Sequence, residues 1–259
     1  VLFSTMGKGD RTDEDGGSST ESGAATGGSA NTAPAEEGLM KPRAGETDAQ
    51  IKARIRDSLG RFFGATKPDD LLNVVRDPQR VKPLIEDYYS RKPFEMPRIE
   101  GISSAEEGMV NLKPIWVVEV RLEDFGTKLV LVQDSEQGFL VDWETFVIYN
   151  PVDWDDYLEA RPQDPMSFRV YAKLDHNPGY AFADPDEWVC VELTAFGSGE
   201  ELYGYARRGS ETARRLEEEL ENQFDWQCIV ELQFPEDAKG GDNQVHLLNV
   251  LTNGWIWVD

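Results

Sequence analysis

The chain has 259 residues, 39% of them hydrophobic, and its 49 acidic residues outnumber its 26 basic residues to give a formal net charge of −23. This length suggests one or two domains. Because nucleic acids and anionic membrane surfaces are bound through Lys and Arg, the charge argues against DNA, RNA and lipid headgroups as partners. Two cysteines, Cys190 and Cys228, are too few for a disulfide framework or a zinc site, and the sequence leaves open whether they form one disulfide or remain buried thiols.

Residues 1–46 are rich in Gly, Ser, Thr, Ala and acidic residues, and almost no large apolar residue follows Met6. Such a segment buries too little surface to offset its ordering entropy, so we expect a disordered acidic tether. Residues 1–6 are apolar but too short to span a bilayer, and they are either the end of a removed anchor or signal segment or a cloning remnant. The tether favours an anchor, and hence a protein held near a membrane. No Lys/Arg cluster follows residues 1–6, which favours the extracytoplasmic side of the cell envelope over the cytoplasm.

The next segment predicts three helices. Thr47 and the glutamine three residues later stand at capping-box spacing, and apolar residues then recur at helical spacing as far as Gly64. A second start signal predicts a helix over residues 66–75, and an Asp-Pro pair predicts a third over residues 78–89. Pro83 lies inside the third helix and should kink or delay it.

Period-two alternation of apolar residues then predicts three strands, over residues 115–122, 128–132 and 138–147. Polar and glycine-containing segments separate them, at residues 123–126 and 134–138, and predict two hairpin turns. The order of helices followed by antiparallel strands indicates an α+β domain.

Helices followed by a meander that ends in GFLVDWE at residues 138–144 resemble the NTF2-like fold, a curved sheet wrapped around helices to form a cone. The resemblance covers about residues 47–150, and the short sheet implies an abridged version of the cone. NTF2-like domains often pair through their sheets, which implies a possible homodimer.

Enzymatic members of the NTF2-like group, such as isomerases and dehydratases, use a pocket inside the cone in which an Asp, Tyr or His acts on a proton. The matching block of this chain contains no His, and Asp142 lies in the matching strand. Since Asp142 alternates with Val141 and Trp143, we expect its carboxylate to point outward. Tyr88 and Tyr89 either line the mouth of such a pocket or pack in the core.

Residues 151–259 predict a second, strand-rich domain. Alternating apolar residues place strands at residues 168–174, 189–193, 202–207, 226–234 and 244–251, with a helix that begins at Ser210 between the third and fourth. This order resembles the OB-fold, a five-stranded, partly open barrel. Together the two blocks resemble uncharacterised membrane-tethered bacterial proteins, a resemblance that implies no particular function.

The sequence shows no recognisable catalytic apparatus. His246 alternates with apolar residues in a strand and His176 lies in a turn, so both are best explained as structural residues. A loop near His176 carries five possible oxygen ligands for calcium, namely Asp175, Asn177, Asp184, Asp186 and Glu187. This loop lacks EF-hand spacing, and a solvated acidic loop explains it equally simply. We therefore predict no enzyme activity, no metal and no cofactor.

Tyrosines of the second domain are the candidate partner-binding residues. Tyr171, Tyr203 and Tyr205 fall opposite the inward faces of their strands, and Tyr180 lies in the loop between two strands. Exposed aromatic residues are enriched at protein interfaces, whereas packing between the two domains would bury them without any partner.

The features together predict a non-enzymatic binding or scaffolding module that is tethered near a membrane and contacts protein partners. A small-molecule pocket in the first domain is the alternative, and a folded spacer in the cell envelope is a third. An interior filled by Trp116, Phe139 and Trp143 would argue against the pocket.

Overall fold

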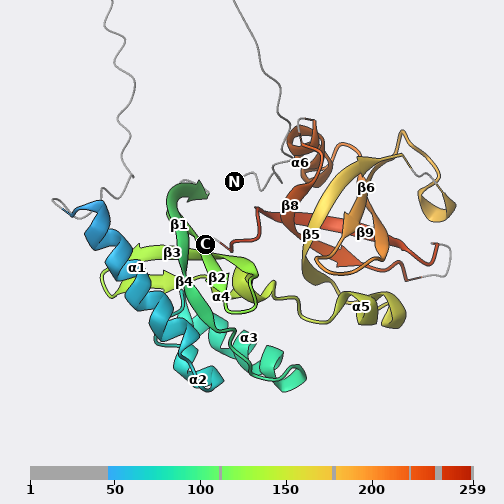
Figure 1. Cartoon of the computed structure of the whole chain (residues 1–259). Helices are drawn as coiled ribbons and strands as arrows, with labels where there is room; N and C mark the ends of the chain where they lie inside the picture. Colours follow the sequence, from blue (N-terminus) through green and yellow to red (C-terminus); the bar gives the residue numbers. More distant parts are fainter. Residues whose placement is uncertain (1–45, 111–112, 177–178, 222, 237–240, 258–259) are drawn as a thin grey trace, which may run out of the picture.

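The computed structural model describes residues 46–110, 113–176, 179–221, 223–236 and 241–257. These residues form two units that lie side by side (Figure 1). The sheet unit contains helices α1–α4 and a four-stranded sheet, and the barrel unit contains α5, α6 and a closed five-stranded barrel. The expected α+β class is thus confirmed. The tether expected at residues 1–46 lies outside the described residues except for Glu46.

The first helix, α1 (Asp48–Phe63), forms as its sequence predicts. Thr47 and Gln50 make the reciprocal capping box, in which the Thr47 N–H donates to Gln50 Oε1 at 2.8 Å. The helix ends at Gly64 and buries the face that carries Ile55 and Leu59. Burial of this apolar stripe against the sheet gives the helix its stability, since isolated helices of this length are marginal in water.

The next two helices differ from the expectation at their boundaries. The second, α2 (Pro68–Leu71), is one turn long rather than reaching residue 75, because Val75 leaves the helix and forms a parallel bridge with Val141. The third, α3 (Pro78–Arg91), begins without delay and runs through Pro83, which costs it only one backbone N–H.

The sheet has the order β1-β2-β3-β4 with all neighbours antiparallel, and its strands are β1 (Ile99–Val110), β2 (Lys113–Leu122), β3 (Thr127–Ser135) and β4 (Gly138–Val141). Strand β1 was not expected, because its sequence is rich in Ser, Glu and Gly and lacks apolar alternation. The prediction that the last strand reaches residue 147 is wrong. Asp142 accepts the Thr145 N–H at 2.8 Å, ends β4 and begins α4 (Trp143–Val147).

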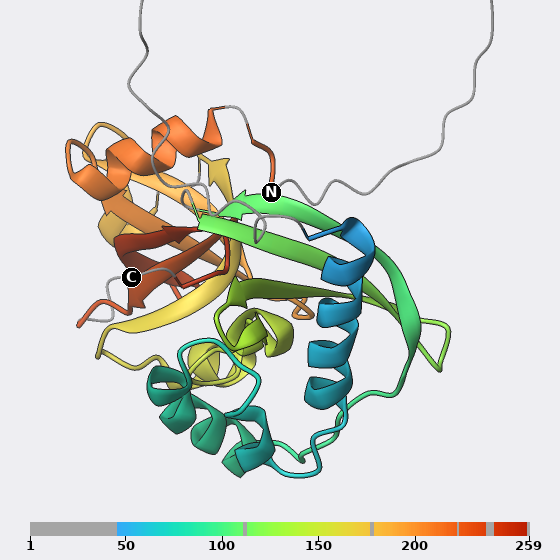
Figure 2. The same cartoon turned by 90° about the vertical axis from the view of Figure 1, so that its left-hand side faces the viewer.

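Helix α1 packs against one face of the sheet, as Figure 2 shows. Helix α3 contributes Val81 and Ile85 to the same core, which is filled. Phe139 and Trp143 are each only 1% exposed, and the Trp116 ring lies 6.1 Å from the Phe139 ring. The Trp143 ring packs against the Tyr88 ring, with centroids 5.6 Å apart. Large aromatic side chains therefore fill the interior of the sheet unit.

The barrel unit begins with α5 (Trp154–Ala160). Its strands are β5 (Met166–Asp175), β6 (Trp188–Thr194), β7 (Glu201–Arg207), β8 (Trp226–Gln233) and β9 (Gln244–Asn253), closed in the order β5-β6-β7-β9-β8. Only the β7–β9 pair is parallel among these neighbours. Along the chain, helix α6 (Glu211–Leu220) follows the third barrel strand and precedes the fourth, and the Ser210 side chain caps it. The expected order of strands and helix is therefore confirmed.

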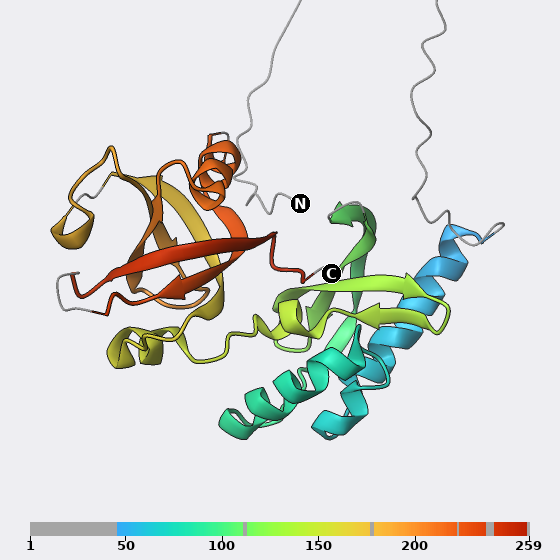
Figure 3. The ribbon, with the colours of Figure 1, turned by 180° about the vertical axis from the view of Figure 1, so that it is seen from behind.

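The segment that follows β9 returns from the barrel to the sheet unit (Figure 3). Ile256 packs against Ile115 and Leu131 on the face of the sheet opposite the helices. The Trp255 carbonyl accepts hydrogen bonds from Thr145 Oγ1 at 3.1 Å and from Arg169 Nε at 3.0 Å. The end of the barrel thus holds the two units together.

Candidate functional site

Three of the four candidate tyrosines lie on the outer face of strands β5–β7. Alternate residues of these strands point into the core, and the ladder pairs Tyr171 with Thr194, Glu192 with Tyr203, and Cys190 with Tyr205. The strand pattern therefore places Tyr171, Tyr203 and Tyr205 together on one side of the barrel, as their sequence alternation predicts.

The fourth candidate, Tyr180, lies on the short 3-10 helix η1 (Tyr180–Phe182), in the loop that joins β5 to β6. This loop folds onto the same barrel face. Phe182 stacks on Tyr205 with ring centroids 4.1 Å apart and planes within 4° of parallel. Gln244 Nε2 donates to the Tyr205 hydroxyl at 2.9 Å, and burial raises the pKa of Tyr205. Tyr205 is only 1% exposed, so it is not available as a surface contact.

The other three tyrosines remain accessible to different degrees. Tyr180 is 77% exposed, whereas Tyr171 and Tyr203 are half-buried. The Tyr171 ring lies 4.9 Å from the Trp255 ring. Lys173 and Glu192, which face each other across the β5–β6 ladder, form an ion pair of 3.3 Å on this face. The face therefore combines aromatic rings with charged side chains.

One exposed aromatic residue beside this face, Phe196, was not among the predicted contacts. Phe196 lies in the turn between β6 and β7, is 64% exposed, and its ring is 6.4 Å from that of Trp255. The available signal was a large apolar residue directly before a Gly-Ser-Gly turn, where polar residues are the norm.

The two histidines occupy the structural positions that the sequence predicts. His246 on β9 packs against Phe182 at 5.0 Å and Trp188 at 5.9 Å, and its burial lowers its pKa. His176 is exposed, and its backbone N–H donates to the Asp175 carboxylate at 2.7 Å. Neither position combines an imidazole with a neighbouring nucleophile among the contacts that the structure describes.

The acidic loop between β5 and β6 does not gather its side chains. Asp184 accepts the backbone N–H of Asp186 at 2.9 Å, as in an ordinary turn, and Asn177 lies outside the described residues. In the described part of the chain no three His, Cys, Asp or Glu side chains come together in a way that could hold a metal ion.

The two cysteines are free thiols on opposite sides of the barrel wall. Cys228 belongs to the barrel core, where burial raises its pKa. Cys190 lies in the outer cluster with Phe182 and Tyr205. The open question of a disulfide is thus answered in favour of two buried thiols.

Asp142 does not point outward, in contrast to the sequence-based expectation. It is 4% exposed, caps α4 and is paired with Arg76. The expectation failed because it assumed a continuous strand through residue 147, whereas a helix begins after Asp142. The partner, Arg76, is distant in sequence, so no local pattern pointed to the pair.

A second buried carboxylate, Glu144, joins the two units. It is paired with Arg80 of α3 and, at 3.0 Å, with Arg169 of β5. Burial by itself would raise the pKa of Glu144, but the hydrogen bond from Arg80 and the charges of Arg169 and Arg80 outweigh it, and the pKa is lowered. This network links the two units at their junction.

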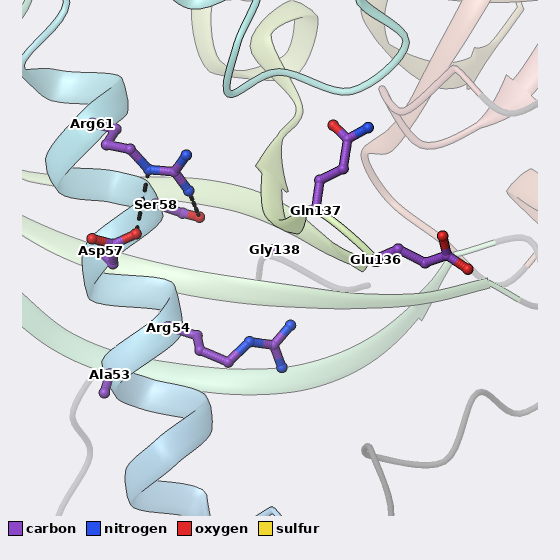
Figure 4. A pocket seen from close by; sticks show the side chains of 8 residues that line it. All are labelled: Ala53, Arg54, Asp57, Ser58, Arg61, Glu136, Gln137 and Gly138. Atoms are coloured by element: carbon purple, nitrogen blue, oxygen red, sulfur yellow. Dashed lines mark hydrogen bonds and ion pairs between the residues drawn. The ribbon is translucent and has the colours of Figure 1, made fainter.

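Two hollows lie on the surface, away from the filled interior of the sheet unit. The larger, of about 460 Å³, lies between α1 and the turn from β3 to β4. Figure 4 shows Arg54 and Arg61 projecting from α1 into it. Arg54 is paired with Glu46 and Asp134, and Arg61 with Asp57 at 3.3 Å, so these cations are already neutralised.

The smaller hollow, of about 390 Å³, lies on the barrel unit between α5, the start of β7 and the turn before β9. It is lined by Asp155, Leu158, Glu159, Glu200, Glu201, Asp242 and Asn243. The five carboxylates extend the negative surface of the chain.

No protein-family model matches the chain, and no curated protein matches it. No helix among the described residues is long and apolar enough to cross a membrane.

Proposed function

We propose that this chain is a non-enzymatic binding module that contacts a protein partner through the outer face of β5–β7. The observation that carries the proposal is the 77% exposure of Tyr180, on the loop that folds onto the barrel face where Tyr171 and Tyr203 are half-buried. Tyrosine supplies a large contact area at a small cost in conformational entropy and is enriched at interfaces. The polar pair between Lys173 and Glu192 adds specificity rather than affinity.

The topology supports an OB-like assignment for the barrel unit. The order first-second-third-fifth-fourth, a parallel pair between the third and fifth strands, and a helix between the third and fourth strands are the features we attribute to that fold. Many OB-folds bind nucleic acid or sugars on the outer face of the second and third strands. The net charge of −23 disfavours nucleic acid here, so we favour a protein partner.

For the sheet unit we propose an abridged NTF2-like domain, supported by helices packed on one face of a four-stranded sheet. The alternative function, a small-molecule pocket inside this unit, has less support because Phe139 and Trp143 fill its interior. The proposed tether over residues 1–46, and a position near a membrane, rest on the amino-acid composition alone.

The proposal is tested by cross-linked pull-down of the full chain from membrane and soluble fractions, read by mass spectrometry. A double variant, Tyr180→Asn with Tyr203→Ser, is expected to lose a stoichiometric partner. Asn is chosen because Tyr180 has a positive φ of 51°, which Asn tolerates. The matched control is Phe125→Asn, which removes an aromatic residue that is 93% exposed on the sheet unit and that also has a positive φ, of 66°.

Retention of the partner by the double variant, or its equal loss from the control, would contradict the proposed surface. Enrichment in the membrane fraction would support the tether. If the protein were found only in the soluble fraction and without a partner, the small-molecule-binding alternative would be favoured. A thermal-shift screen of metabolites would then test it.

A further inference from the structure

One long sheet edge has no neighbouring strand among the described residues. The barrel is closed and so has no edge. The β4 edge of the sheet is covered, because the Arg76 N–H donates to the Val141 carbonyl at 2.9 Å and the Val141 N–H donates to the Val74 carbonyl at 2.8 Å. Strand β1, at 12 residues, is the other edge and pairs only with β2.

Part of β1 forms a regular ladder. Residues 104–110 pair with residues 113–119 of β2 without interruption, and the register shifts are confined to residues 99–104. In an antiparallel pair, alternate residues direct their N–H and C=O groups away from the neighbouring strand. Edge strands are usually protected by Pro, charged side chains, bulges or short length. Residues 104–110 contain no Pro and no bulge, so the protection of this edge rests on the charges of Glu106 and Glu107.

The negative charge of this edge determines which kind of strand can pair with it. Glu106 and Glu107 are exposed, and the ladder places Val117 and Trp116 opposite them. Neither carboxylate forms an ion pair with another described residue. A second copy of the chain would bring like charges to the same edge, which is unfavourable. A strand that carries Lys or Arg would instead gain favourable cross-strand pairs.

We infer that residues 104–110 of β1 accept an extended, basic segment of a protein partner by strand addition. The added strand would donate to and accept from the outward backbone groups of β1. Because consecutive strand residues point to opposite faces, a Lys or Arg on one face of the added strand would pair with Glu106 and one on the other face with Glu107. This surface lies on the sheet unit and is independent of the tyrosine face of the barrel.

The test uses the full chain and a fluorescent eight-residue peptide of alternating Lys and Val, whose Lys side chains share one face and therefore meet Glu106 or Glu107 according to the register. Binding is followed by fluorescence anisotropy, and hydrogen exchange locates the peptide. The expected result is slowed exchange of amides within residues 104–110, with no change on β9. A peptide of alternating Glu and Val is expected to give no protection. N-methyl groups are placed on every second residue of the Lys-Val peptide, either on the residues whose amides face β1 or on the other residues. Only the first pattern is expected to abolish binding.

Charge reversal provides the matched variants. Glu106→Lys with Glu107→Lys is expected to lower the affinity for the Lys-Val peptide about tenfold at low salt, and less at high salt. Glu86→Lys with Glu95→Lys gives the same change in net charge on the same unit and is expected to leave the affinity nearly unchanged. The double variant Tyr180→Asn with Tyr203→Ser should also bind normally, which separates this proposal from that for the barrel.

Several outcomes would overturn the inference. These are no protection of residues 104–110, equal protection by the acidic peptide, and equal loss in both charge-reversal variants. If hydrogen exchange of the β1 amides in the free chain became slower as the protein concentration rose, a second copy of the chain would occupy the edge. If exchange of the outward β1 amides in the free chain were slow at every protein concentration, the chain's own N-terminal segment would occupy the edge.

Discussion

Arg169 of the barrel and Glu144 of the sheet unit form an ion pair of 3.0 Å, and each side chain is only 5% exposed. Arg169 Nη1 also donates to the Tyr149 carbonyl at 2.6 Å, and its Nε donates to the Trp255 carbonyl. A single guanidinium group therefore contacts the helix, the linker and the C-terminal segment at the junction.

Glu144→Gln should strongly destabilise the protein. The variant leaves Arg169 and Arg80 near a neutral amide, and breaking a buried pair from one side costs about 3 kcal/mol or more. We expect a loss of this size in the free energy of unfolding, measured by urea titration with tryptophan fluorescence.

The control for this change is Glu86→Gln, which removes an exposed carboxylate 3.8 Å from Lys82. It should alter stability by no more than about 0.5 kcal/mol. If both variants lost the same small amount, Glu144 would not organise the junction.

The Glu144 carboxylate should also make the free energy of unfolding depend on pH. Because the folded-state pKa of Glu144 is lowered from 4.5, its contribution is fully present above that value and is lost as the pH falls through the lower folded-state pKa. The stability difference between wild type and Glu144→Gln should therefore be constant above about pH 5 and shrink below it. Urea titrations at several pH values measure this difference. A difference that grew on acidification would refute the assignment.

Tyr157→Phe should stabilise the barrel. Tyr157 is fully buried, with its ring 4.4 Å from Phe168, and its hydroxyl has no hydrogen-bond partner among the described residues. Removing an unsatisfied buried hydroxyl should gain about 1 kcal/mol. Thermal unfolding measures the change.

The matched variant is Tyr149→Phe, because the Tyr149 hydroxyl donates to the Asp87 carboxylate at 3.0 Å. It should lose about 1 kcal/mol. Equal destabilisation by both substitutions would show that the Tyr157 hydroxyl is satisfied, for example by a bound water.

His246 should weaken the packing of the loop over Tyr205 when it is protonated. Burial lowers its folded-state pKa, so the stability it contributes is complete above the unfolded value of about 6.5 and is lost as the pH falls below that value. We expect the imidazole to titrate below 6.5 by NMR, and the Phe182 amide, which donates to the Gly179 carbonyl at 2.9 Å, to lose protection on acidification.

His176→Gln makes the assignment unambiguous, because it leaves His246 as the remaining histidine of the chain. His246→Gln should remove the acid-dependent loss of protection at Phe182. Titration of His246 at or above the unfolded value would contradict the burial that this prediction assumes.

Elements with strong local signals could be predicted from the sequence. The capping box at Thr47 and the terminating Gly64 delimit α1, and Ser210 marks the start of α6. The barrel strands alternate because each has one face in a closed core, so their apolar residues recur every second position.

Elements defined by distant contacts could not be predicted in this way. Strand β1 lacks alternation and exists because β2 pairs with it. The run after Val141 suits a strand or a helix, and only the Asp142 cap, together with the pair to Arg76, selects the helix.

The candidate face shows the same division between local pattern and tertiary contact. Alternation along the strands is enough to predict that Tyr171, Tyr203 and Tyr205 point away from the barrel core, because strand geometry sets side-chain direction every second residue. Which of them stay exposed was decided by the tertiary structure, in which a loop places Phe182 on Tyr205 and the C-terminal segment places Trp255 beside Tyr171. Local periodicity specifies the face of a strand, whereas burial depends on segments that arrive from elsewhere in the chain.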